Sequence, residues 1–583
     1  MTQPLRKTKI VCTMGPNLFE KGLIKPLMLA GMDVARFNFS HDTHENHLKR
    51  FKEVCRIRDE LGLPVATMLD TKGPEIRIGT FAEHRVTLDA GQLFTLTTED
   101  VEGDETRVSV TYKDLPRDVK PGCAILIDDG LVGMTVERVT DTDVCCKVNN
   151  GGTISDKKGV NIPDAHLSMP FISPKDREDI LFAIENGFDF IAASFTRNAD
   201  DIMQIRHIMA EKHCTSINII AKIENMEGVQ NIDEILRVSD AIMVARGDMG
   251  VEIPLEEVPV LQKMLIKKCY AAGKPAITAT QMLDSMMKNP RPTRAETTDV
   301  ANAIYDGTSA IMLSGETAAG MYPLEAVKTM ARIALRAEAS IDYESRFRKR
   351  EYGTQTDITS AISHATVTSA QDLKASAIIT VTKSGTTARV ISKYRPSCMI
   401  IGCTTSASVW RQLSLSWGVV PLMISEESNT DDLFEHAVDS AVAANLIHDG
   451  ELVVLTAGVP LGISGTTNLM KVHVVGHMLV KGQGLCGNQV TASLCVAHSE
   501  QEAKDTFREG NVLVIHKVTR ELLPMLRKAT GLILEDSNPD GLGAIAGLSL
   551  DIPVIIGACG ATAILKSGAV VTMDGAKGTV SCN

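Results

Sequence analysis

No apolar run in the sequence is long enough to cross a membrane, which takes about 20 consecutive apolar residues. The N-terminus also lacks the apolar core of a secretory signal peptide, because residues 1–7 lead directly into a short apolar strand. Hydrophobic residues make up 44% of the 583 positions and charged residues 23%, as in ordinary soluble globular proteins. We therefore expect a cytoplasmic protein with no membrane partner.

A basic surface is missing as well. The formal net charge is −12 and no basic stripe compensates it, which argues against a nucleic-acid partner. Any positively charged site for an anion must therefore be local. None of the thirteen cysteines forms a C-x-x-C pair, so zinc and redox sites are disfavoured. Their scatter and odd number predict reduced thiols in the cytoplasm.

Short apolar runs recur through the first 320 residues, and stretches with helix signals separate most of them. Eight runs occupy residues 9–13, 34–39, 65–69, 190–195, 217–223, 241–245, 276–279 and 310–313. Near-continuous apolar strands that alternate with helices are typical of a parallel sheet covered on both faces. Eight such units predict an α/β protein with a (β/α)8 TIM barrel at residues 1–72 and 169–345, whose active site lies at the carboxyl ends of the strands.

Three further regions lie outside the predicted barrel. Residues 73–168 are rich in Thr, Val, Asp and Gly, which predicts an inserted small β-barrel placed as a lid. Residues 346–476 again alternate strands and helices and predict an α/β regulatory domain. Residues 477–583 contain no long low-complexity segment, which predicts an extra folded α/β domain rather than a disordered tail.

The end of the fifth run carries Lys222 and Glu224, and Asp248 follows the sixth run. Side chains two positions apart on a strand share one face. An isolated Lys-x-Glu is most often an ordinary ion pair. A lysine beside two carboxylates is also what a divalent metal holding an anionic substrate requires, because the carboxylates bind the metal and the ammonium faces the remaining negative charge. The pattern predicts a site for phosphate.

Polar residues also lie at the ends of four other predicted strands. Each has a simple structural reading by itself: Arg36 as a surface cation, or Ser314-Gly315-Glu316 as a helix cap. Six strand ends with such groups favour one shared site over six coincidences. The groups are Arg36, Asn38 and Ser40; Asp70, Thr71, Glu75 and Arg77; Lys222 and Glu224; Gly247 and Asp248; Thr280; and Ser314 and Glu316.

Seven segments resemble motifs of the pyruvate kinase family and occur in that family's order from residue 5 to about 476. They are residues 8–16, 69–77, 221–225, 243–248, 281–286, 290–296 and 313–318. The resemblance implies an enzyme that transfers the phosphoryl group of phosphoenolpyruvate to ADP, giving pyruvate and ATP in the last step of glycolysis. It also agrees with the barrel and implies a homotetramer.

The family's motifs assign roles to the strand-end residues. Glu224 and Asp248 would bind Mg²⁺ or Mn²⁺, and Lys222 would stabilise charge on the transferring phosphoryl group. Arg36 would hold the phosphate through its guanidinium fork. The Gly247-Asp248 peptide and the hydroxyl of Thr280 would hold the substrate carboxylate.

Loss of the phosphoryl group leaves an enolate that must be protonated at carbon. Thr280, Ser314 and Glu316 match the side of the pocket where the family's proton relay runs. Which group donates the proton stays open.

A set of K⁺ ligands and a set of nucleotide contacts also follow from the resemblance. Residues Asn38, Ser40, Asp70 and Thr71 match the family's K⁺ site. Glu75 accompanies K⁺ dependence in the family, whereas members with Lys there carry their own cation, so we expect K⁺ dependence. Matches to nucleotide contacts are Asn38, Phe39, Ser40, His41, Arg77 and Lys158.

A possible effector loop follows the apolar strand at 377–381 and opens a helix. It consists of Thr382, Lys383, Ser384, Gly385, Thr386 and Thr387. Backbone N–H groups and hydroxyls at a helix start can cradle a phosphate, although an isolated Ser-Gly-Thr-Thr is more often a plain turn. The matching loop of the family binds the phosphate of an activator, and a fructose bisphosphate, a pentose phosphate and AMP all stay open.

The last hundred residues resemble the phosphohistidine carrier domain of phosphoenolpyruvate synthases and dikinases, at residues 552–557 and 575–578. That domain needs a Ser-His pair about ten residues before its Ile-Pro. Here the matching positions are Gly541 and Leu542, and His516 lies on a different predicted strand. We expect the carrier fold without its chemistry, with a role in subunit contact or stability.

Two other functions were weighed. A phosphoenolpyruvate synthase or dikinase is disfavoured by Leu542 and by the lack of a separate ATP-grasp region. A catalytically inactive metabolite sensor is disfavoured because the chain keeps the full set of charged and hydroxyl groups that the reaction needs. These are Arg36, Lys222, Glu224, Asp248 and Thr280.

Overall fold

The computed structural model describes residues 5–582 except 164, 166, 350–356, 428, 449–450, 459–466, 477 and 488. The chain divides into two compact units. The first comprises Met1–His364, Thr382–Ser425 and Gly462–Thr466, and the second comprises Ala365–Val381, Glu426–Leu461 and Thr467–Asn583. None of the helices in the described part of the chain combines the length and the hydropathy that a bilayer crossing requires.

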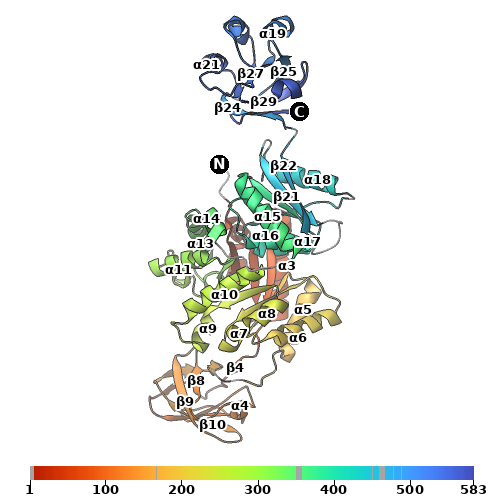
Figure 1. Cartoon of the computed structure of the whole chain (residues 1–583). Helices are drawn as coiled ribbons and strands as arrows, with labels where there is room; N and C mark the ends of the chain where they lie inside the picture. Colours follow the sequence, from red (N-terminus) through yellow and green to blue (C-terminus); the bar gives the residue numbers. More distant parts are fainter. Residues whose placement is uncertain are drawn as a thin grey trace. The chain divides into compact units, whose positions relative to one another are not determined.

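Eight parallel strands of the first unit close into a barrel, which confirms the predicted (β/α)8 fold (Figure 1). Their order around the barrel is β1-β17-β16-β15-β14-β13-β3-β2. The bounds are β1 (Lys9–Thr13), β2 (Val34–Asn38), β3 (Ala66–Asp70), β13 (Phe190–Ala193), β14 (Asn218–Ile223), β15 (Ala241–Ala245), β16 (Ala276–Ala279) and β17 (Ala310–Leu313). Each lies within two residues of its predicted run, because uninterrupted apolar sequence marks a doubly covered strand clearly.

Helices connect these strands. The longer ones are α3 (His44–Leu61), α5 (Pro174–Asn186), α6 (Ala199–Glu211), α10 (Val258–Ala272), α11 (Arg294–Asp306) and α13 (Pro323–Glu338). Shorter ones are α1 (Pro16–Glu20), α2 (Ile24–Ala30), α7 (Met226–Gln230), α8 (Ile232–Val238), α9 (Arg246–Glu252), α12 (Gly315–Ala318) and α14 (Tyr343–Lys349). Helix α5 starts with a capping box between Ser173 and Asp176 and ends at Gly187, whose φ of 68° suits a residue without a side chain.

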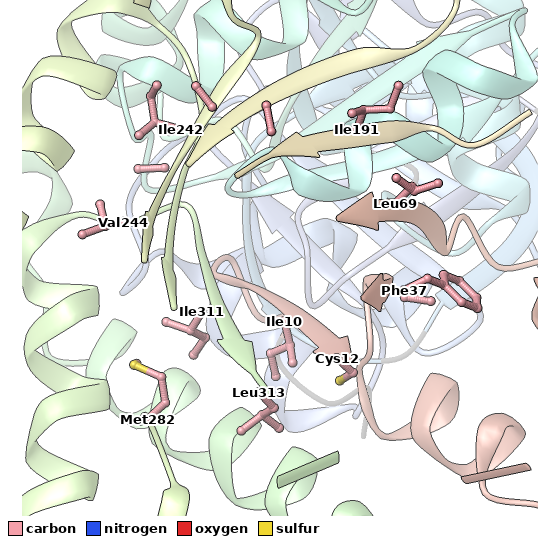
Figure 2. Close-up of a cluster of buried hydrophobic side chains, with 14 of the residues drawn as sticks. Ile10, Cys12, Phe37, Leu69, Ile191, Ile242, Val244, Met282, Ile311 and Leu313 are labelled. Atoms are coloured by element: carbon pink, nitrogen blue, oxygen red, sulfur yellow. The ribbon is translucent and has the colours of Figure 1, made fainter. Parts of the chain in front are cut away.

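Alternate residues of each barrel strand enter two separate apolar cores. Side chains such as Ile10, Phe37, Leu69, Ile242 and Leu313 belong to the core shared with the surrounding helices (Figure 2). The residues next to them in sequence fill the barrel interior, and that inner cluster contains Val11, Val34, Met68, Phe190, Ile220, Met243, Ile277 and Met312. Both faces of the sheet are therefore largely apolar.

The segment inserted after β3 is built almost entirely of strands. A seven-stranded sheet has the order β4-β12-β8-β9-β10-β6-β7, and β11 pairs with β5 in a second sheet. Its elements are β4 (Ile76–Arg77), β5 (Arg85–Leu88), β6 (Leu93–Thr97), β7 (Arg107–Ser109), α4 (Leu115–Asp118), β8 (Ala124–Ile127), β9 (Val132–Val139), β10 (Asp143–Val148), β11 (Gly152–Ser155) and β12 (Gly159–Asn161). This segment has its own apolar core, which includes Phe94 and Val136.

The region after the barrel alternates strands and helices, and the division between the two units runs through it. Strand β19 pairs in parallel with β20, β18 pairs in parallel with β21, and β21 pairs antiparallel with β22. The elements are α15 (Ile358–Asp372), β18 (Ala377–Val381), α16 (Thr386–Lys393), β19 (Met399–Thr404), α17 (Ala407–Gln412), η2 (Leu413–Leu415), β20 (Val419–Met423), α18 (Thr430–Ala443), β21 (Leu452–Gly458) and β22 (Thr467–Val474).

The C-terminal residues fold around one mixed sheet, as expected for an extra α/β domain. Its order is β23-β30-β29-β25-β26-β27-β28-β24, and the four strands β25 to β28 are mutually parallel. The strands are β23 (Met478–Lys481), β24 (Gln483–Cys486), β25 (Gln489–Ala497), β26 (Val512–Ile515), β27 (Gly531–Leu534), β28 (Val554–Ile556), β29 (Val570–Asp574) and β30 (Thr579–Cys582). The helices are α19 (Glu500–Thr506), α20 (Leu523–Leu526), α21 (Leu542–Ser549) and α22 (Ala561–Ile564).

Candidate active site

Lys222 lies in an ion cluster at the carboxyl ends of β3 and β14. Its ammonium nitrogen is 3.1 Å from Asp70 Oδ1 and 3.1 Å from Glu224 Oε1. It also donates a hydrogen bond of 2.6 Å to the hydroxyl of Ser194, which follows β13. Lys222 is 8% exposed and Glu224 is fully buried. Lys222 and Glu224 thus form one cluster with Asp70 of β3 and with Ser194, which follows β13.

Asp70 connects Arg36 to the same cluster. Arg36 donates from Nε to Asp70 Oδ2 at 2.6 Å and from Nη1 to the hydroxyl of Thr13 at 2.9 Å. The carboxylate of Asp70 therefore has a cation at each oxygen, Arg36 at one and Lys222 at the other. Arg36 and Lys222 thus fix two cations beside one buried carboxylate, and a guanidinium suits phosphate oxygens.

Charge and burial set the protonation states of the cluster. Burial by itself would lower the pKa of Lys222, but Asp70 and Glu224 outweigh it, so this pKa lies above its ordinary value. Burial likewise opposes ionisation of Asp70, yet Arg36 and Lys222 hold the pKa of that carboxyl below its usual range. Burial raises the pKa of Glu224 to about 8. The negative charge of Asp248 also raises this pKa, whereas the positive charge of Lys222 lowers it.

The carboxylate of Glu224 has one oxygen available for a metal ion. Its Oε2 accepts a hydrogen bond of 2.5 Å from the backbone N–H of Phe195, while the buried Oε1 accepts no hydrogen bond and, among the described residues, is in ionic contact with Lys222 alone. Within the described residues no group of three or more His, Cys, Asp or Glu side chains could hold a metal. Two carboxylates, Glu224 and Asp248, fit Mg²⁺, which keeps several waters and takes its other ligands from bound phosphates.

Asn38 and Asp70, two members of the expected K⁺ set, are directly paired between β2 and β3. Asn38 Oδ1 accepts from the backbone N–H of Ser40 at 3.2 Å, which keeps this turn compact. Thr71 is buried and donates its backbone N–H to Ala192 at 3.0 Å. Glu75 Oε1 is 2.6 Å from Arg77 Nη2, so the acid from which K⁺ dependence is expected lies beside a nucleotide candidate.

The expected nucleotide residues fall on the lid and on the loop after β2. Arg77 of β4 donates to the carbonyl of Lys157 at 2.7 Å, and Lys158 is 2.9 Å from Asp128 Oδ1. His41 is exposed, whereas the ring of Phe39 is buried and stacks on His47 at 4.1 Å between centroids. Phe39 therefore presents only backbone atoms to that loop's surface.

A cavity of about 360 Å³ separates the lid from the strand ends. Glu75 and Gly159 line it from the lid, and Asp248 and Glu252 line it from the barrel. Asn161 of β12 donates to Glu252 Oε1 at 2.7 Å and so joins the lid to helix α9. The volume lies in the range of small-molecule sites.

The three relay candidates have different surroundings. Glu316 is 2% exposed, and its two oxygens accept backbone N–H groups from Leu283 at 2.9 Å and Ser314 at 2.8 Å. Burial raises the pKa of Glu316. Its carboxyl group thus fastens the turns after β16 and β17. Thr280 lies in the first of these turns with a φ of 74°.

The expected effector loop forms a tight turn before α16. Gly385 has a φ of 78°, and its backbone N–H donates to the hydroxyl of Thr382 at 2.9 Å. The hydroxyls of Ser384 and Thr386 are 3.0 Å apart, and Arg389 donates to the carbonyl of Ser384 at 2.9 Å. Thr387 is buried and Lys383 is exposed. Hydroxyls, a helix start and an arginine meet here, which is a suitable environment for a phosphate.

The carrier position in the C-terminal domain is apolar. Helix α21 starts at Leu542, with Gly541 as its N-cap residue. His516 instead follows β26, and its Nδ1 is 3.1 Å from Glu535 Oε2. It therefore lies at a strand end rather than at the helix start where the carrier histidine is expected.

Two contributors were not predicted from the sequence, Ser194 and Thr13. Ser194 also donates to the carbonyl of Thr71 at 2.7 Å, and Thr13 to the carbonyl of Leu313 at 3.0 Å. Each is a hydroxyl residue at the end of an apolar run, and that position was the available signal.

Comparison with known proteins agrees with this arrangement. The family model "Pyruvate kinase, barrel domain" matches residues 5–327, and "Pyruvate kinase, alpha/beta domain" matches residues 360–473. The chain belongs to the pyruvate kinase family. A third model, "PEP-utilising enzyme, mobile domain", matches residues 507–578, which confirms the resemblance seen in the last hundred residues.

Relatives extend over the whole chain. A pyruvate kinase of Geobacillus stearothermophilus is 48% identical over 577 residues, covering 99% of this chain and 98% of the relative. One of Bacillus licheniformis is 49% identical over 578 residues and covers 99% of both. A crystal structure of a pyruvate kinase from Cryptosporidium parvum has a TM-score of 0.77 and 42% identity, covering 81% of this chain and 96% of that one.

Proposed function

We propose that this chain transfers the phosphoryl group of phosphoenolpyruvate to ADP, producing pyruvate and ATP, at the carboxyl ends of the barrel strands. The observation that carries the proposal is the buried cluster of Lys222, Asp70, Glu224 and Arg36. Its two fixed cations suit a transferring phosphoryl group, and Oε1 of Glu224, which accepts no hydrogen bond, suits a divalent metal. Membership of the family supports the same reaction.

Phosphoryl transfer asks the protein for positioning and charge stabilisation more than for covalent chemistry. Lys222 stays an ammonium at neutral pH and stabilises charge on the phosphoryl oxygens, while Arg36 holds the phosphate from the neighbouring strand. Glu224 and Asp248 would hold Mg²⁺ or Mn²⁺, which would neutralise negative charge on the transferring phosphoryl group. The peptide at Gly247-Asp248 orients the substrate carboxylate.

Protonation of the enolate is the second task of the site. The hydroxyl of Thr280 supplies the proton at the substrate carbon, or passes it from solvent. Ser314 and Glu316 line the same side, and the two backbone bonds accepted by Glu316 support a positioning task for it. In this proposal, Lys222 and Arg36 act on the phosphate at one side of the pocket, and Thr280 acts on the substrate carbon at the other side.

A potassium ion is the second cation that we propose. Oxygens of Asn38, Ser40, Asp70 and Thr71 hold it beside the phosphate site, and the pairing of Asn38 with Asp70 supports this set. Glu75 takes the place at which a lysine would supply a built-in cation. Activity is therefore expected to require K⁺.

The remaining ligands follow from the family. ADP or ATP occupies the cavity under the lid, contacted by Arg77, Lys158, His41 and the turn at Asn38–Ser40. An activator with a phosphate group, either a sugar phosphate or a nucleoside monophosphate, binds the loop from Thr382 to Thr387. The enzyme works in the cytoplasm as a homotetramer.

A lactate dehydrogenase-coupled assay of pyruvate release tests the proposal. With phosphoenolpyruvate, ADP and Mg²⁺, we expect NADH oxidation that depends on K⁺ and rises with the correct phosphate-bearing activator. Full activity without K⁺ would refute the K⁺ site while leaving the reaction intact. No pyruvate under any cation or activator condition would favour an inactive sensor. Activity dependent on AMP and pyrophosphate would favour a dikinase, and activity dependent on AMP and inorganic phosphate would favour a synthase.

A further inference from the structure

Two consecutive residues after β16 have a strained backbone. Thr280 has a φ of 74° and Gln281 a φ of 54°, both in the left-handed region. A threonine there is a marked outlier, because its β-branched side chain crowds the backbone. Such residues persist only where the surrounding structure holds them in place, and they concentrate at functional sites.

One side chain holds this turn from outside. Arg246 donates from Nε to the carbonyl of Ala279 at 3.2 Å and from Nη2 to the carbonyl of Thr280 at 2.7 Å. Its Nη2 also contacts the sulfur of Met282 at 2.8 Å. The planar fork thus spans two successive carbonyls, where a single ammonium of lysine could not keep both bonds in this geometry.

The guanidinium is itself anchored on its other side. Its Nη1 is 2.8 Å from Asp299 Oδ1 on α11 and 3.4 Å from Gln262 Oε1 on α10. The side chain is 14% exposed, so these bonds are largely shielded from water. Arg246 is therefore braced between two helices and the turn.

Arg246 also stands directly before Gly247 and Asp248. A Cβ on Gly247 would lie 2.8 Å from Cγ2 of Thr280, so the start of α9 touches the turn after β16 and leaves no room for a side chain at position 247. Fixing the Thr280 turn to Arg246 hence fixes it to the peptide that precedes the metal ligand.

We propose that Arg246 is a positioning residue for the carbon chemistry: its guanidinium holds the left-handed turn at Thr280–Gln281 against the Gly247-Asp248 peptide and so aims the Thr280 hydroxyl at the substrate carbon. Asp299 orients the guanidinium. This inference rests on the proposed role of Thr280 in protonating the enolate. It separates the carbon side of the pocket from the phosphate side, where Lys222 and Arg36 act without contact to Arg246 among the bonds described.

Two rates measured on the full-length enzyme test the inference. One is the exchange of pyruvate methyl protons for deuterium in D₂O with ATP, Mg²⁺ and K⁺, followed by proton NMR. The other is formation of ATP from phosphoenolpyruvate and ADP, followed by hexokinase coupling. For Arg246→Lys we expect proton exchange to fall by about tenfold to a hundredfold and ATP formation to fall several times less, because the hydroxyl is displaced while the phosphate contacts remain.

A second variant distinguishes positioning from general stability. Glycine adopts positive φ without cost, so Gln281→Gly lowers the energy of the turn itself. We expect Arg246→Lys/Gln281→Gly to recover part of the lost exchange, and Asp299→Asn to give a smaller loss of the same kind. The matched control is Arg206→Lys, because Arg206 bonds a carbonyl and a carboxylate at the opposite end of β15. That control should leave the ratio of the two rates unchanged.

The results distinguish the proposed role of Thr280 from the proposed role of Arg246. If Thr280→Val leaves proton exchange unchanged, the proposed role of Thr280 fails. If Thr280→Val slows exchange but Arg246→Lys lowers both rates equally, with no recovery by Gln281→Gly, the role of Arg246 is structural only and the inference is overturned.

Discussion

At the residue scale, the account depends on how one buried ammonium is held. Lys222 has three oxygen partners from three different strand ends, namely Asp70, Glu224 and Ser194. The two carboxylates fix its charge, and the hydroxyl adds direction. A charge that is preorganised in this way stabilises a transition state without reorganisation at the moment of reaction.

The substitution Ser194→Ala tests how much the hydroxyl of Ser194 contributes to catalysis. Ser194→Ala should lower kcat by about tenfold while leaving the KM for ADP nearly unchanged, because Lys222 keeps its charge but loses one orienting partner. Steady-state kinetics by the coupled assay measure both constants. Ser239→Ala is the matched control, since Ser239 is a buried serine whose hydroxyl donates to a carbonyl before β15, at the opposite barrel end. Equal losses in both variants would show that only packing was disturbed.

Thiol reactivity reports on burial in the same barrel. Burial raises the pKa of Cys269 to about 12, whereas Cys559 is exposed. The thiolate is the reactive form, so Cys269 stays unreactive between pH 7 and 9 and would gain reactivity only as pH approaches 12. Mass spectrometry after iodoacetamide treatment at pH 8 should find Cys559 alkylated and Cys269 intact until urea is added. Early alkylation of Cys269 would contradict the packed core.

Much of the site was visible in the sequence, for definite reasons. Lys222 and Glu224 share a face because strand side chains alternate, and Arg36 and Asp248 follow other strands that end at the same rim. Ser194 and Thr13 were missed because a hydroxyl after an apolar run has many structural uses. The bonds of Arg246 to the turn after β16 depend on tertiary packing that no local pattern encodes.

At the element scale, a polar contact joins the lid to the barrel beside the cavity. Asn161 at the end of β12 bonds Glu252 of α9, and both line the cavity. The Thr, Val, Asp and Gly content of residues 73–168 indicated a β-rich insertion, whereas the order of its strands in the sheet follows from long-range pairing. The barrel strands were more predictable still, because each is apolar on both faces.

Loss of the lid contact should weaken nucleotide binding. Asn161→Ala is expected to raise the KM for ADP by about threefold to tenfold, since one hydrogen bond of about 1 kcal/mol that favours closure is removed. The KM for phosphoenolpyruvate should change less. Asn149→Ala, on the lid but outside the cavity, serves as the control. A larger effect on phosphoenolpyruvate than on ADP would contradict the assignment of the cavity to the nucleotide.

At the scale of the whole molecule, three family-related parts accompany one catalytic centre. The barrel and the α/β region match the pyruvate kinase models, and the last domain matches the mobile domain of phosphoenolpyruvate-utilising enzymes. The sequence alone indicated both likenesses, and it also indicated the apolar residue at the carrier position. The start of α21 at Leu542 agrees with that reading.

The C-terminal domain should carry no phosphoryl group. After incubation of the full-length enzyme with radiolabelled phosphoenolpyruvate, we expect no acid-labile, base-stable phosphate on residues 477–583. The reason is that Leu542 offers no nucleophile at the carrier position. A phosphoenolpyruvate synthase treated in parallel shows that the assay detects phosphohistidine. Labelled His516 would contradict the expectation.

The central claim is that the reaction takes place around Lys222 at the strand ends. The most direct measurement compares pyruvate release by Lys222→Met and by Lys274→Met, the second of which removes a half-buried lysine from the amino end of the barrel. The account predicts that Lys222→Met lowers kcat by about a hundredfold to a thousandfold at saturating Mg²⁺ and K⁺, with Lys274→Met within a few-fold of the parent enzyme. A folded Lys222→Met enzyme that kept most of its activity would contradict the account.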